Sequence, residues 1–179
     1  MRAAKVKGLD PAASLRSNLS RIVEVRLGEL CRLAELASRP RESVAQHDMR
    51  IAAKRLRYVL EVTAPCLGAD ADRARKAARD LQDVLGEIHD CDVMLPRVRG
   101  TIERLRAEDA GAVLHRAGTA GDLDPALVAA APHSGAYEGL ELLITHLAAR
   151  RALLFDRFLE GWRAHQAPGG TWERLRRLL

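Results

Sequence analysis

Residues 43–63 separate into a polar and an apolar side when they are wound into an α-helix. The apolar side consists of Ala45, Met49, Ala52, Leu56, Val59 and Leu60. Along the polar side, at steps of three and four, follow His47, Arg50, Lys54, Arg57 and Glu61. Like charges at this spacing cost about 0.2–0.5 kcal/mol per pair, so the row requires a compensating partner. Either acidic side chains of another helix neutralise it, or an extended polyanion lies along it.

The composition predicts an all-α fold. Leu, Ala, Arg and Glu dominate the 179 residues, and runs of β-branched residues are nearly absent. A hydrophobic fraction of 47% with 30% charged residues is typical of a globular domain, and the length suits a single one. We therefore expect a helical bundle of long antiparallel helices, about five to six in number, over residues 9–179. A loose basic arm at residues 1–8 precedes it.

Capping and breaking residues predict the helix boundaries. Asp10 and Pro11 have the pattern of an N-cap followed by proline in the first turn, whereas Pro65 and Pro96 should each end or kink a helix. Gly86 in mid-helix indicates close packing with a neighbour, because glycine costs about 1 kcal/mol there relative to alanine. The expected helices cover residues 11–38, 43–63, 70–96, 97–116, 136–165 and 171–179, and residues 117–135 form a flexible loop with one helical turn at 125–130.

Charge and cysteine content restrict the partners and the compartment. The net charge of +5 favours an anionic partner, while 3% aromatic residues disfavour single-stranded nucleic acid, which binds on aromatic platforms. Three widely spaced cysteines, Cys31, Cys66 and Cys91, predict buried free thiols in a reducing compartment. No apolar run approaches the length of a membrane span, and no signal-peptide core is evident, so we expect a cytoplasmic protein without membrane association.

The cationic row has the chemistry of a phosphate-binding surface. Arg50 and Arg57 offer planar forks, Lys54 a compact charge and His47 a ring donor. The ten residues from His47 to Arg57 cover about 15 Å of helix axis, which matches a linear run of phosphates better than a single one. A solvated helix face would interleave acids more regularly. We therefore favour polyanion binding over a plain solvated face.

Two other features leave alternatives open. The pairs His47-Asp48 and His89-Asp90 suggest a metal-dependent phosphohydrolase, but such a site needs further converging ligands, and the cations beside His47 repel a metal ion. His89 is therefore interpreted as surface polarity, and no metal or cofactor is expected. Arg151 falls within an apolar stripe, where it is either a structural ion pair or a further cation of the binding groove.

Two motifs resemble those of the CHAD family, the conserved-histidine α-helical domains. They are His47-Asp-Met-Arg50-Ile-Ala-Ala-Lys54-Arg55-Leu-Arg57-Tyr58 and Leu81-Gln-Asp-Val-Leu-Gly86-Glu-Ile-His-Asp90-Cys-Asp-Val. The resemblance is close from about Leu9 to Val98 and fainter over Tyr137 to Trp162. It implies a helical bundle whose basic groove binds inorganic polyphosphate without catalysis. The binding residues that it implies, together with neighbouring cations, are His47, Arg50, Lys54, Arg55, Arg57, Arg75, Lys76, Arg79, Arg150 and Arg151.

Many members of that family carry the two-helix motif twice, whereas this chain shows one copy. A homodimer is therefore a possible way to complete the groove. We expect a targeting or scaffolding module that is not an enzyme. The alternatives are a module that binds protein or nucleic acid through the same basic face, and a metal-dependent phosphohydrolase.

Overall fold

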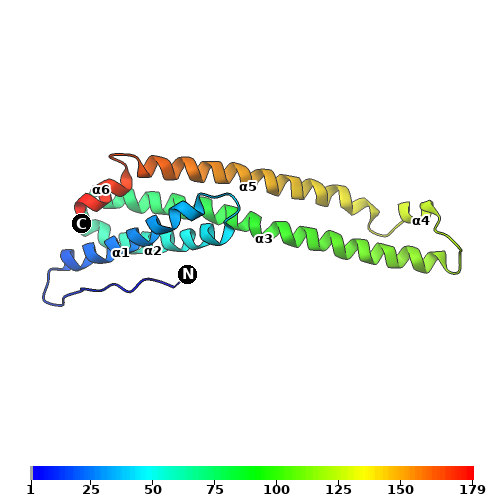
Figure 1. Cartoon of the computed structure of the whole chain (residues 1–179), viewed down its shortest axis with the longest axis horizontal. Coiled ribbons are helices and arrows are strands. Elements are labelled where there is room, and N and C mark those ends of the chain that lie inside the picture. The colour runs from blue at the N-terminus through cyan, green and yellow to red at the C-terminus, as the bar shows by residue number, and fades with distance from the viewer. Residues whose placement is uncertain (1) are drawn as a thin grey trace. The chain divides into compact units, whose positions relative to one another are not determined.

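The computed structural model describes residues 2–179, in which every regular element is a helix, as the composition predicts. The helices are α1 (Leu15–Ala37), α2 (Ser43–Leu67), α3 (Ala69–Ala117), α4 (Pro125–Ala129), α5 (Tyr137–Gln166) and α6 (Thr171–Leu178), with a short 3-10 turn η1 at Ser134–Ala136 (Figure 1). The chain divides into two compact units. The first comprises Met1–His89 and Leu153–Leu179, and the second Asp90–Ala152.

The first unit is a bundle in which α1 packs along α2 and against α6. The first part of α3 and the last part of α5 supply further apolar side chains to the same core. Burying one such side chain contributes about 1.5–3 kcal/mol to the free energy of folding, and this burial stabilises the packing of the helices against one another. The largest fully buried apolar residues are Val23, Leu27, Leu30, Met49, Leu56, Leu60, Leu85, Ile88, Phe158, Trp172 and Leu175.

The first helix starts four residues later than the capping pattern predicts. Ser14 is the N-cap, and its side chain accepts a hydrogen bond from the backbone N–H of Ser17 at 3.2 Å. Asp10 instead accepts from the N–H of Ala12 within a turn. The side chain of Asn18 bonds to both the N–H and the carbonyl of Asp10, which folds this turn back onto the helix. Ser14, which lies closer to the apolar stripe, therefore caps the helix in place of Asp10.

Two prolines that should end or kink helices lie within continuous ones. Pro65 is in the last turn of α2, which continues to Leu67 and ends at Gly68, where φ is +90°. Pro96 lies inside α3, so the helices predicted at 70–96 and 97–116 are one element. Pro96 is exposed, and the stripe around it stays buried at Cys91 and Val98. Packing of that stripe offsets the lost backbone hydrogen bond, which costs roughly 3 kcal/mol in a helix interior.

The second unit joins the later part of α3 to the first part of α5 through residues 118–136. The helical turn predicted at 125–130 is confirmed as α4, and α5 begins within one residue of its predicted start. The buried carboxylate of Asp109 accepts hydrogen bonds from the backbone N–H of His133 at 3.0 Å and the hydroxyl of Tyr137 at 2.7 Å. This bond raises the pKa of Tyr137, and Asp109 ties the end of the connecting segment to α3.

The N-terminal arm precedes α1 in the sequence and runs alongside it without regular secondary structure (Figure 1). Arg26 donates to the carbonyl of Ala4 at 3.1 Å, and Arg21 donates to the carbonyl of Lys7 at 3.2 Å. The described part of the arm is therefore held against α1 rather than loose.

The cysteines depart in part from the prediction of buried thiols. All three are free, and Cys91 is buried, but Cys31 is half-buried and Cys66 is exposed. Cys66 lies in the last turn of α2 between the buried residues Thr63 and Leu67, on the side of the helix that faces away from the core. Among the described residues, no helix combines the length and the apolar character that crossing a membrane requires.

Candidate anion-binding site

Helices α2 and α3 run antiparallel in the first unit, because Gly68 alone connects them. Near one end the rings of His47 and His89 lie 4.7 Å apart between centroids. One turn further, Gly86 faces Arg50, and a Cβ added to this glycine would lie 3.9 Å from Arg50 Cδ. Each step along α2 is thus matched by an equal step back along α3.

This register continues to the connection between the helices, where Glu61 and Arg75 line the same shallow depression. Extending it places Arg79 level with Arg57. We call this edge of the two helices the polar seam, comprising His47, Arg50, Lys54, Arg57 and Glu61 of α2 with Arg75, Arg79, Gly86 and His89 of α3.

Several hydrogen-bond donors of the polar seam are buried without an acceptor in the described part of the protein. They are Nδ1 of His47 and Nε of Arg50 and Arg57. Arg57 forms an ion pair with Glu61 at 3.4 Å, whereas no carboxylate among the described residues lies within ion-pair distance of Arg50 or Lys54. Acidic residues of a neighbouring helix therefore do not neutralise the centre of the row, and its charges remain available to an anion.

Tyr58 holds two of these cations through its ring. The guanidinium carbon of Arg57 lies 4.6 Å from the ring centroid and the ammonium of Lys54 lies 5.7 Å from it. Such cation–π contacts contribute about 0.5–1 kcal/mol at exposed sites. Tyr58 thereby restricts the positions of both charges without consuming their hydrogen-bond donors.

The cations of α3 are paired with acids of their own helix. Asp72 accepts from Arg75 at 2.9 Å and lies 3.1 Å from the ammonium of Lys76, and Arg79 is 3.7 Å from Asp83. Bonds from Arg75 and Lys76 lower the pKa of Asp72. Exposed ion pairs of this kind are weakened by solvent, so these cations remain available to a more highly charged anion.

The remaining predicted residues lie away from this row. Arg55 is half-buried on α2, one residue after Lys54 and therefore about 100° around the helix. Arg150 is exposed on α5 in the second unit. Arg151 forms a two-point ion pair with Asp92 of the same unit, with Nε 2.5 Å from Oδ1. Of the two alternatives for Arg151, the structure shows the ion pair, and its role in anion binding stays a prediction.

His89 is the residue of the seam that sequence reasoning missed. Its ring lies against His47, and both side chains are half-buried. Burial lowers the pKa of His47 most, the nearby charges of His89 and Arg50 lower it further, and Asp48 acts in the opposite direction. Among residues 2–179, no group of three or more His, Cys, Asp and Glu side chains is placed to hold a metal ion.

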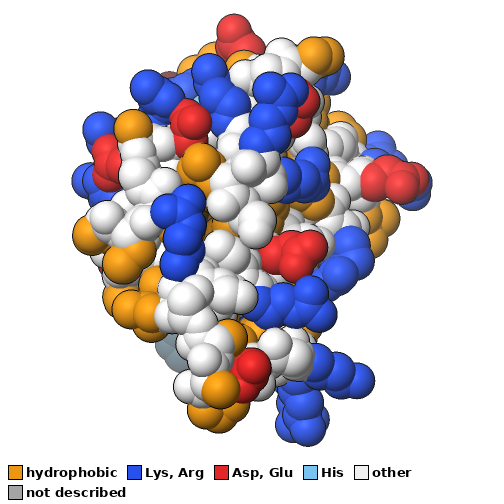
Figure 2. Space-filling view, turned by 90° about the vertical axis from the view of Figure 1, so that its left-hand side faces the viewer, with side chains coloured by type: hydrophobic (Ala, Val, Ile, Leu, Met, Phe, Trp, Pro, Cys, Tyr) orange, Lys and Arg blue, Asp and Glu red, His pale blue; other side chains and the backbone are white. Residues whose placement is uncertain are grey.

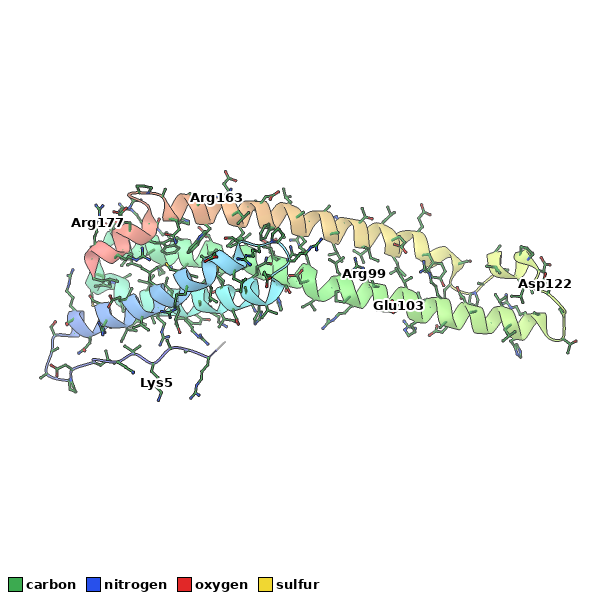
Figure 3. All side chains as sticks on the ribbon, in the orientation of Figure 1. Lys5, Arg99, Glu103, Asp122, Arg163 and Arg177 are labelled. Atoms are coloured by element: carbon green, nitrogen blue, oxygen red, sulfur yellow. The ribbon has the colours of Figure 1, made fainter. Side chains whose placement is uncertain are left out.

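The labelled side chains of Lys5, Arg163 and Arg177 point outward from the arm, α5 and α6 (Figure 3). The end of the molecule drawn in Figure 2 shows Lys and Arg side chains in excess over Asp and Glu. Charge on this surface is spread among acidic and apolar groups, whereas the polar seam aligns cations at regular steps. Alignment rather than charge alone therefore distinguishes the seam.

The comparison with family models gives one match. The model described as the CHAD domain covers residues 2–99, which is more than half of the 179 residues and includes every residue of the polar seam. Comparison with curated proteins and with solved structures gives no match. The chain belongs to the CHAD domain family.

Proposed function

We propose that the first unit binds inorganic polyphosphate along the polar seam. The observation that carries this proposal is the row of cations along α2, in which Arg50 and Lys54 have no carboxylate within ion-pair distance among the described residues. Phosphate oxygens are strong acceptors for guanidinium and imidazole donors. The chain belongs to the CHAD family, and the resemblance of its two motifs to that family implies polyphosphate binding. Both support this choice of anion.

The spacing of the cations suits a chain of phosphates. Arg50, Lys54 and Arg57 present one charge per helical turn along about 10 Å of α2. Arg75 and Arg79 approach from α3 on the opposite side of the seam, so a linear anion lying between the helices meets cations from both sides. A compact anion would engage one turn and leave the others uncompensated.

We infer that binding is not followed by hydrolysis. Cleavage of a phosphoanhydride needs a nucleophile or an activated water molecule near the phosphorus atom. Glu61 of the seam and Asp72 and Asp83 of α3 are each engaged with a cation of the same helix. The seam therefore surrounds an anion with cations and imidazoles, which suits a targeting or scaffolding role.

The test is direct binding of polyphosphate of defined length to the full chain, followed by analysis of its length. We expect saturable, salt-sensitive binding and an unchanged chain length after prolonged incubation with divalent cations. Polyphosphate should displace duplex DNA, and duplex DNA should not displace polyphosphate. Shortening of the chain would support a phosphohydrolase, and displacement by DNA would support a nucleic-acid module.

We also propose that the protein acts in the cytoplasm, and that two chains associate around the anion. An exposed free thiol at Cys66 is compatible with a reducing compartment. Dimer formation would supply the second copy of a motif that this chain shows once. Light scattering with and without polyphosphate tests the dimer. A protein that is a monomer under both conditions and still binds polyphosphate at full affinity would contradict it.

A further inference from the structure

We propose that His47 and His89 act together as a two-proton switch that strengthens polyphosphate binding as the pH falls below neutrality. This inference rests on the proposed function and adds His89 to the binding site. The two imidazoles come from facing helices, and their ring centroids are 4.7 Å apart with an angle of 47° between the planes. His47 stands one turn before Arg50, at one end of the cationic row.

The surroundings of His47 disfavour a proton on its ring in the free protein. Among the described residues, the charged and titratable groups that act on His47 are Asp48 and Arg50 from α2 and His89 from α3. Arg50 and a protonated His89 both repel a second positive charge, and burial adds to this effect. Asp48 opposes them but does not reverse the direction. The His47 ring therefore resists protonation, and a positive charge on either of two rings this close disfavours a second one on its neighbour.

A polyanion in the seam reverses this balance. Each imidazole takes one proton from the solvent and donates the new N–H to a phosphate oxygen, so the charge of the pair changes from zero to as much as plus two. Nδ1 of His47 has no hydrogen-bond partner among the described residues, and in the protonated ring it carries an N–H. Binding and proton uptake are thus coupled, and the number of protons taken up equals the slope of log affinity against pH.

The experiment measures polyphosphate affinity of the full chain between pH 8 and pH 5.5, with a chelator present, by calorimetry in two buffers of different ionisation enthalpy. One proton changes affinity at most about tenfold per pH unit. We expect the steepest part of the wild-type profile to exceed tenfold per unit. His47→Gln and His89→Gln should each reduce it to tenfold or less. The double variant should retain only the shallow slope contributed by terminal phosphates and the α-amino group.

The matched control is the double variant His115→Gln with His146→Gln, which removes two exposed imidazoles from the second unit. It should keep the wild-type slope. The inference would be overturned if His89→Gln kept the wild-type slope, or if the control variant lost as much slope as the histidine variants. Either result would leave polyphosphate binding itself intact. Absence of binding by the wild type at every pH would overturn the proposed function and this inference together.

Discussion

Charge reversal at two positions of α2 tests the polar seam most sharply. Arg50 and Arg57 lie two turns apart, and each has a buried Nε without an acceptor among the described residues. A charge-assisted hydrogen bond contributes about 1.5–3 kcal/mol, and 1.4 kcal/mol corresponds to a tenfold change in affinity. Arg50→Glu combined with Arg57→Glu should therefore weaken polyphosphate binding at least about 100-fold, since repulsion adds to the lost contacts.

The same variant should alter the salt dependence and leave the fold in place. Fewer counterions are displaced when fewer cations contact the anion, so affinity should fall less steeply with salt. Fluorescence titration over a range of salt concentrations measures both effects. Both side chains are half-buried at the edge of the apolar side of α2, so circular dichroism must show wild-type helicity in the double variant before its affinity is compared.

The control reverses two arginines outside the seam, Arg99→Glu with Arg163→Glu, which gives the same net charge. Both side chains are exposed, and both are labelled in Figure 3. An equal loss of affinity in the two double variants would show that binding follows overall charge. That result would refute the assignment of the site to the polar seam.

Three further predictions concern stability. Gly86→Ala should raise the free energy of unfolding by about 0.5–1 kcal/mol in urea denaturation, because the added methyl group meets Arg50 Cδ at an ordinary contact distance of 3.9 Å; a loss would show that the helices are closer than described. Trp172→Ala should cost about 3–5 kcal/mol, because the ring is fully buried against Trp162. Burial lowers the pKa of His165, so the unfolded chain binds more protons near pH 6 and stability should fall from pH 7 to pH 5. His165→Gln should reduce this fall, and an unchanged pH profile would contradict it.

Local patterns predict most of the helices, because amphipathic spacing and caps depend on neighbouring residues. Helix α2 begins at Ser43 as predicted, and α5 differs by one residue at each end. The failures at Pro65 and Pro96 have a common cause. A proline costs the helix one backbone hydrogen bond, and burial of the stripe on both sides of it can exceed that cost. Burial is a property of the packed structure, so the sequence pattern alone predicts a break.

The candidate site shows the same limit. The cations of α2 are evident from their spacing, but the contribution of His89 depends on the register between two helices. The predicted helix boundaries leave six residues between these helices, whereas the structure connects them through Gly68 alone and fixes the register. Counting back equally from Gly68 then brings His89 opposite His47. The ion pair of Arg151 with Asp92 has no local signal in the sequence, since these residues are 59 positions apart.

The central claim is that a polyphosphate chain lies along the polar seam. A crystal structure of the full chain with a short polyphosphate tests it most directly. We predict continuous density for the anion parallel to α2, with phosphate oxygens within hydrogen-bond distance of His47, Arg50 and Arg57 and with Arg79 on the opposite side. Density confined to the arginines of α6 or to the second unit, with the seam unchanged, would contradict the claim.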